Sequence, residues 1–72
     1  MKTGMMWYGG TARELGEVIA DGATYYRNKY GRKPDVAFVH PDELKRLKFA
    51  PEGISVQVNT MVQKNYVWMG VK

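Results

Sequence analysis

Three neighbouring residues, His40, Asp42 and Glu43, are the side chains of this chain best suited to acid–base or metal chemistry. An imidazole beside two carboxylates can act as a general base or hold a divalent cation. Zinc and copper sites need further histidine or cysteine ligands, whereas the chain has one histidine and no cysteine. Proline favours the first turn of a helix, so His40-Pro41 is more typical of a helix start capped by a polar side chain. We therefore do not expect an enzyme, and we predict no catalytic residues, no metal site and no cofactor.

A second segment, residues 25–33, interleaves aromatic and basic side chains. Stacking of bases on aromatic rings, together with neutralisation of phosphates, is how proteins bind single-stranded nucleic acids. Tyr26 and Tyr30 belong to the apolar stripe of a predicted helix, and basic residues at a helix C-terminus also complement its dipole. The candidate nucleic-acid-binding residues are therefore Tyr25, Arg27, Lys29, Arg32 and Lys33.

The two ends of the chain are rich in aromatic and methionine side chains, more than the terminal segments can obviously bury. Such side chains are enriched at protein interfaces. A strand near the end of the chain can also form a sheet edge that pairs with another protomer. The alternative is a monomer in which the N-terminal segment covers this surface. The candidate interface residues are Trp7, Tyr8, Tyr66, Trp68 and Met69.

A long helix is the first element predicted to position these groups. Thr11-Ala12-Arg13-Glu14 has the pattern of a capping box, and apolar residues then recur every three or four positions as far as Tyr30. Gly31 suits the left-handed residue that ends a helix. Gly22 lies on the apolar stripe, which indicates either a close approach to a neighbouring strand or protomer, or a tolerated small residue.

Three further segments have the pattern of strands. Residues 36–39 form a continuous apolar run that suits a central strand, residues 54–60 alternate apolar and polar side chains, and residues 66–71 are apolar on both faces. The last two are predicted to pair as a hairpin. Residues 5–8 are either one more strand or an arm.

A short helix is predicted between the first two of these strands, from Pro41 to Lys48, with Leu44 and Leu47 as its anchors. The fold class is therefore α+β, with one long helix plus one short helix packed on a three- or four-stranded sheet, in the order (β)-α-β-α-β-β. The sheet is mixed or antiparallel. Residues 1–72 are predicted to form a single small domain.

Part of this pattern resembles a known family. Residues 33–44, Lys-Pro-Asp-Val-Ala-Phe-Val-His-Pro-Asp-Glu-Leu, with residues 53–58 and the closing strand 67–71, are similar to part of the tailed-phage major capsid proteins. That family often shows a proline-led strand ending in Asn-Pro before a helix; here His40 replaces the asparagine, and Ser55 stands where proline is common. Over residues 15–71 the resemblance implies an α+β fold with a sheet beside a long helix, self-association and a phage origin. It carries over no catalytic residues.

The charge and hydropathy of the chain limit the classes of partner that it can have. A net charge of +4 favours acidic partners without specifying one. The longest apolar runs are four residues, far short of the ~20 that cross a bilayer, so we expect a cytoplasmic protein with no membrane partner. The first functional hypothesis is a non-catalytic protein–protein interaction or self-assembly domain that forms a homo-oligomer or binds a protein partner. The alternative is a small nucleic-acid-binding protein that uses the basic end of the long helix.

Overall fold

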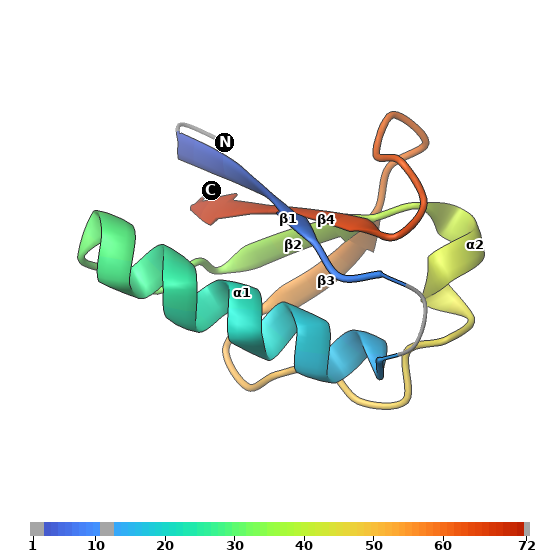
Figure 1. Cartoon of the computed structure of the whole chain (residues 1–72), viewed down its shortest axis with the longest axis horizontal. Helices are drawn as coiled ribbons and strands as arrows, with labels where there is room; N and C mark the ends of the chain where they lie inside the picture. The colour runs from blue at the N-terminus through green and yellow to red at the C-terminus, as the bar shows by residue number, and fades with distance from the viewer. Residues whose placement is uncertain (1–2, 11–12, 72) are drawn as a thin grey trace.

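The computed structural model describes residues 3–10 and 13–71 of the chain. These residues form two helices and four strands in the order β-α-β-α-β-β (Figure 1), so the predicted α+β class and element order are confirmed and the N-terminal segment is a strand. The elements are β1 (Thr3–Tyr8), α1 (Leu15–Tyr30), β2 (Val36–Val39), α2 (Pro41–Leu44), β3 (Ser55–Val58) and β4 (Tyr66–Val71). Neither helix of the described residues has the length and apolarity that a bilayer crossing requires.

The four strands form one mixed sheet in the order β1-β4-β2-β3. β4 is antiparallel to both β1 and β2, whereas β3 is parallel to β2. The predicted hairpin between residues 54–60 and 66–71 is therefore wrong. Its error has a physical reason: β4 is apolar on both faces and takes a central position, whereas β3 alternates with polar side chains and lies at an edge.

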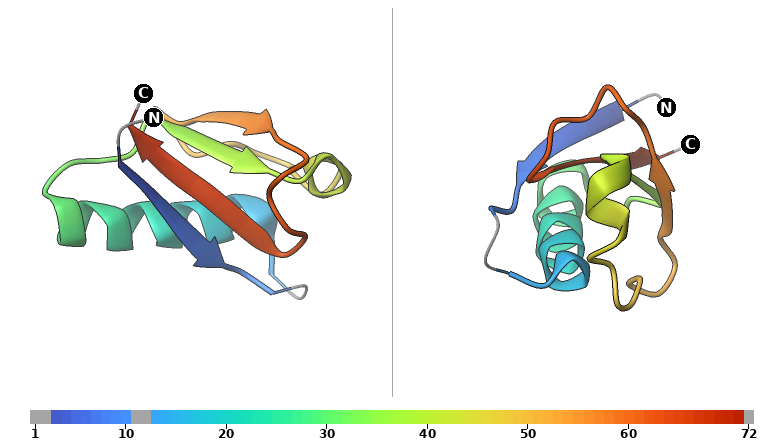
Figure 2. Two further views of the ribbon diagram at one scale, coloured as in Figure 1. Left: turned by 90° about the horizontal axis from the view of Figure 1, so that it is seen from above. Right: turned by 90° about the vertical axis from the view of Figure 1, so that its right-hand side faces the viewer.

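α1 lies against one face of the sheet and forms the core with it, as the end-on view in Figure 2 (right) shows. The helix ends as predicted, because Gly31 adopts a left-handed φ of 81° and its N–H donates to the Arg27 carbonyl at 2.8 Å. The buried cluster takes Leu15, Val18, Ile19 and Tyr26 from α1 and Met5, Ala37, Val39, Val67 and Met69 from three strands. Burial of this one apolar stripe is the main stabilising term of the fold.

The start of α1 differs from the prediction. The helix begins at Leu15 after an N-cap at Glu14 whose side chain makes no capping hydrogen bond, and Thr11 lies outside the described residues. A tertiary contact explains the late start: the Arg46 guanidinium donates to the Arg13 carbonyl at 2.7 Å. Gly16 also packs so tightly that a Cβ there would lie 2.6 Å from the Phe49 carbonyl oxygen. Contacts distant in sequence therefore override the local capping pattern.

α2 is shorter than predicted and is anchored by a different residue. His40 caps it, as its sequence indicated, with Nδ1 accepting from the Asp42 N–H at 3.1 Å. Leu47 packs against the core, but Leu44 is 41% exposed, so its predicted role as an anchor is wrong. Glu43 is buried in its place, at 6% exposure. A charged residue can replace an apolar anchor here because its carboxylate is fully hydrogen-bonded, as described below.

We expect Gly22→Ala to destabilise the fold. In an open helix the exchange gains about 1 kcal/mol, but here the added Cβ would lie 2.6 Å from Met69 Cε and 2.8 Å from Trp7 Cδ1. Overpacking of this kind costs about 1–3 kcal/mol, so the free energy of unfolding in a denaturant titration should fall. Glu17→Ala, on the exposed side of the same helix, is the control and should change it by less than about 0.5 kcal/mol. A Gly22→Ala chain more stable than the unaltered one would contradict the close approach.

Candidate protein interface

The alternation of side chains along β1 and β4 divides the five candidate interface residues between the two faces of the sheet. Met69 lies in the core beneath α1 with 0% exposure, and Trp7 packs on the same side against Gly22. Tyr8, Tyr66 and Trp68 alternate with these residues and therefore point to the opposite side. The structure thus brings three of the five together and leaves Met69 no surface for a partner.

We call the side of the sheet opposite α1 the open face. Its central row crosses all four strands, because the registers align Met6, Trp68, Phe38 and Gln57. Figure 2 (left) looks onto this side, with α1 behind the sheet, and within the described ranges no helix lies over it. The open face carries Met6, Tyr8, Phe38, Ser55, Gln57, Tyr66 and Trp68, none of which is an acidic or basic residue.

The aromatic side chains of the open face are held in place by contacts within the sheet. The indole of Trp68 lies over Gly4, where a Cβ would come within 2.4 Å of its Nε1. Only a glycine at position 4 therefore lets the indole lie flat on the neighbouring strand. The rings of Tyr8 and Tyr66 are in contact, with centroids 5.1 Å apart, although Tyr8 is 63% exposed. The open face is thus a preformed apolar surface.

The connection between β3 and β4, residues 59–65, rises over one end of the open face on the side away from α1 (Figure 1). It walls a hollow of about 280 Å³ with a mostly apolar lining: Met6, Phe38, Asn59, Met61, Val62 and Trp68. Val62 is buried, whereas Met61 points into solvent with 86% exposure. The open face therefore has a hollow and, beside it, a protruding side chain.

Hydrogen bonds within the connection hold Met61 in this position. The Asn59 side chain accepts from the Met61 N–H at 2.8 Å, and the Asn59 carbonyl accepts from the Val62 N–H at 3.1 Å. The strand pairing extends to Asn59 itself, whose N–H donates to the Val39 carbonyl at 2.9 Å. An asparagine that bonds its own backbone two residues on is a standard turn device. The backbone of Met61 is thus tied to the sheet by a short chain of hydrogen bonds, while its side chain extends into solvent.

Of the six residues that line the hollow, only Trp68 is among the predicted interface residues. The sequence indicates Met61 only as one of the excess methionines, and Phe38 only as part of a central strand. Phe38 lies in the continuous run 36–39, and only the sheet order shows that it alternates to the face opposite Ala37 and Val39. Met61 is an isolated apolar residue in a polar turn, and its exposure depends on which way the turn folds. Strand alternation is the one signal that, given the pairing, would have found Phe38.

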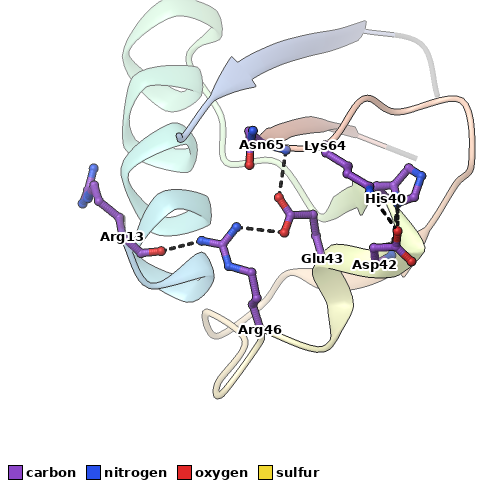
Figure 3. A network of polar contacts seen from close by, with 7 residues as sticks. All are labelled: Arg13, His40, Asp42, Glu43, Arg46, Lys64 and Asn65. Carbon is purple, nitrogen blue, oxygen red and sulfur yellow. Dashed lines mark hydrogen bonds and ion pairs between the residues drawn. The ribbon is translucent and has the colours of Figure 1, made fainter. Parts of the chain in front are cut away.

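A network around Glu43 fixes the loops that flank this surface (Figure 3). One carboxylate oxygen accepts from Arg46 Nη1 at 2.8 Å, and the other accepts from the Asn65 backbone N–H at 2.8 Å. Asn65 has a left-handed φ of 72°, and its carbonyl accepts from the Gly9 N–H at 2.9 Å. Arg46 completes the network by donating to the Arg13 carbonyl. One buried carboxylate thereby links α2 with the ends of β1 and of the β3–β4 connection.

The same contacts set the ionisation of the two acids in this region. Burial raises the pKa of Glu43, but the hydrogen bonds from Arg46 and Asn65 lower it more, so the group ionises below its usual range. The pKa of Asp42 is lowered by its hydrogen bond and attraction to Lys64, whose Nζ lies 3.1 Å away. Both carboxylates are therefore charged at neutral pH and act in ion pairs.

The geometry around His40 is that of a helix cap. His40 Nδ1 is used by the Asp42 N–H, Asp42 pairs with Lys64, and Glu43 faces Arg46 and Asn65 (Figure 3). Among the residues that the structure describes, no group of three histidine or acidic side chains is placed to hold a metal ion. Each of the three residues has a structural partner of its own.

The candidate nucleic-acid-binding residues lie on different flanks of α1. Tyr25 contacts Trp7, with ring centroids 5.2 Å apart, on the flank beside β1. Lys29 lies over the Tyr30 ring at 5.4 Å. Arg27 and Lys33 instead line a hollow on the other flank, between α1 and the α2–β3 connection, and Arg32 is exposed outside it. Tyr25, the candidate stacking residue, and the two cations Arg27 and Lys33 are therefore not on one surface.

Comparisons with protein-family models, with curated proteins and with solved structures found no match to this chain. The resemblance to tailed-phage major capsid proteins therefore stays a prediction.

Glu43 should make the stability of the fold depend on pH. Its pKa is lowered on folding, so its contribution is complete above the unfolded-state pKa of about 4.3 and is lost as the pH falls through the folded-state pKa. Glu43→Gln, which removes the charge facing Arg46, should lower the free energy of unfolding at pH 7 by about 1–3 kcal/mol. Denaturant titrations between about pH 3 and 7 measure this difference, which should shrink toward the acid end.

The control for this experiment is Glu17→Gln, because Glu17 is exposed on α1 and has no ion pair among the described residues. Its difference from the unaltered chain should be small at every pH. A Glu43→Gln difference that stays constant across the titration would show that the carboxylate charge does not stabilise the fold.

Proposed function

We propose that this chain is a non-catalytic self-association domain, in which two copies in the cytoplasm bury their open faces against each other. The observation that carries the proposal is an apolar sheet face whose described residues include no acidic or basic side chain, and which the described helices leave uncovered. Exposed apolar surfaces of this kind mark interaction sites in soluble proteins.

Self-complementarity supports a second copy of the chain as the partner. Met61 and the hollow formed by Met6, Phe38 and Trp68 are neighbours on one surface. In a twofold dimer each surface meets its own copy, so each protruding Met61 can enter the hollow of the other protomer. The flexible thioether of methionine adapts well to such a hollow.

Electrostatics also permit this arrangement. Two copies of a chain with a net charge of +4 repel each other wherever their cations meet. The open-face residues that the structure describes carry no charge, and the nearest cation of the β3–β4 connection, Lys64, is neutralised by Asp42. The described part of the open face is therefore a surface on which two such chains can meet without like charges facing each other.

The size of the open face sets the expected affinity of the proposed dimer. Four strands about 4.8 Å apart, with four to six residues at about 3.3 Å each, span a flat area of roughly 250–380 Å². The relief of the side chains and the β3–β4 connection add to this area. Stable interfaces bury about 800 Å² per partner, out of the 4564 Å² that this chain exposes. The dimer therefore belongs at the lower end of the size range, with a dissociation constant in the micromolar range.

The proposal is tested by light scattering on a sizing column over a range of protein concentrations. The mass should rise toward about twice 8.2 kDa with concentration and should be insensitive to salt. Met61→Lys should raise the dissociation constant about a hundredfold, because twofold symmetry buries two ammonium groups at once. Since Met61 is exposed in the monomer, the thermal midpoint of the dissociated chain should not change.

Leu44→Lys is the matched control, because it also replaces an exposed apolar side chain with lysine but lies on α2, outside the open face. Its mass should follow that of the unaltered chain. A monomer at the highest concentration reached, or equal loss of mass in both variants, would contradict self-association through the open face.

A further inference from the structure

A second hollow, separate from the open face, lies in the helix layer. It has a volume of about 320 Å³ and is bounded by the C-terminal half of α1 and by the α2–β3 connection, which runs beside the helix (Figure 2, right). Ala20, Ala23, Pro51 and Ile54 form its buried or half-buried apolar part. Its exposed part is polar and consists of Thr24, Arg27, Asn28, Lys33 and Glu52.

The two cations of this hollow, Arg27 and Lys33, have no carboxylate partner among the residues that the structure describes. Among the described residues, Arg13, Arg46, Lys48 and Lys64 each form an ion pair with an acid, whereas Lys29, Arg32 and Lys45, like the two cations of the hollow, form none. Arg27 comes from the last turn of α1 and Lys33 from the segment before β2, and the described residues offer neither of them an ion pair. Two unpaired cations from different segments thus converge on one hollow, with a single acid, Glu52, facing them.

We propose that this hollow binds a small phosphate monoester with a compact, hydroxyl-bearing organic body. Arg27 and Lys33 hold the phosphate by charge-assisted hydrogen bonds, and the fork of the guanidinium suits two phosphate oxygens at once. Glu52 and Asn28 bond the hydroxyl groups of the body, and Ala23 and Ile54 contact its carbon atoms. A volume of about 320 Å³ is at the small end of ligand pockets and fits one mononucleotide or sugar phosphate. This site does not depend on self-association.

The phosphate can come from a free metabolite or from the end of a single-stranded nucleic acid. The geometry favours one isolated phosphate, because Tyr25, the stacking candidate, lies on the other flank of α1 against Trp7. A strand bound along the whole basic end of the helix would instead use Lys29 and Arg32, which do not line the hollow.

The experiment is an NMR titration of the full chain with adenosine monophosphate, with adenosine and inorganic phosphate as separate probes. The monophosphate should give saturable shifts at the amides of Ala23, Arg27 and Ile54. Adenosine and phosphate alone should each bind at least about tenfold more weakly, because each makes only part of the contacts. Inorganic phosphate that binds as tightly as the monophosphate would overturn the part assigned to the organic body.

Charge-matched variants separate this site from general attraction to a basic surface. Arg27→Gln and Lys33→Gln should each weaken binding about tenfold or more, whereas Arg32→Gln and Lys29→Gln should weaken it less than about threefold. All four residues are exposed, so the fold should tolerate each exchange. Equal losses in all four variants would overturn the site.

Glu52→Gln gives the sharpest contrast, because a specific site and general attraction to positive charge predict opposite changes in ligand affinity. If Glu52 accepts hydrogen bonds from the ligand's hydroxyl groups, its substitution weakens binding. If the phosphate is held only by the overall positive field, removing a negative charge strengthens binding. A single-stranded oligonucleotide with a terminal phosphate should show the same dependence on Arg27 and Lys33, and equal dependence on Lys29 and Arg32 would overturn the single-phosphate site.

Discussion

The central constraint on this molecule is that one helix must cover a four-stranded sheet. α1 has 16 residues and is therefore about 24 Å long, which is enough to lie along one face of the sheet but not to wrap around it. α2 has four residues and lies at the end of the sheet (Figure 1). The described residues thus form two layers, and the main core cluster lies on the face beneath α1. The opposite face stays in water unless another molecule covers it.

Two glycines adapt the sheet to this two-layer arrangement. Gly22 lets α1 approach Met69 and Trp7, which brings the apolar stripe of the helix into contact with the core side of the sheet. Gly4 lets the Trp68 indole lie flat on the other side. Side-chain alternation along β1 and β4 then places one set of residues in the core and the other on the open face. The aromatic and methionine residues of these strands are therefore divided between two faces of the sheet.

The sequence predicts the long helix and the strands, but it does not predict which strands pair with each other. The apolar period of α1, the left-handed end at Gly31 and the runs 36–39 and 66–71 are local signals, and the structure confirms each of them. The hairpin prediction failed because strand pairing is decided by contacts far apart in sequence, here the match of β4 to both β1 and β2. The prediction of where α1 begins failed for a similar reason, since Arg46 holds the Arg13 carbonyl outside the helix. Burial of Glu43 in place of Leu44 depends on Asn65, which is 22 residues away.

For the candidate site, too, the sequence predicted the types of residue involved but not which of them share a surface. Tyr8, Tyr66 and Trp68 were identifiable as candidate interface residues by type, but the exclusion of Met69 required knowing which strand positions face α1. Arg27 and Lys33 were identifiable as cations, but the hollow they share depends on the path of the α2–β3 connection. Residue type is a local property, whereas the face that a residue joins is a property of the assembled sheet.

The claim that the open face is covered by a second copy is tested most directly by an isotope-filtered NOE experiment on a mixture of labelled and unlabelled chains. Only contacts between protomers give signals in such a mixture. The account predicts NOEs from the Met61 methyl group of one protomer to the Trp68 and Phe38 rings of the other. An absence of intermolecular NOEs under conditions where the mass is that of a dimer, or NOEs confined to the exposed side of α1, would contradict it.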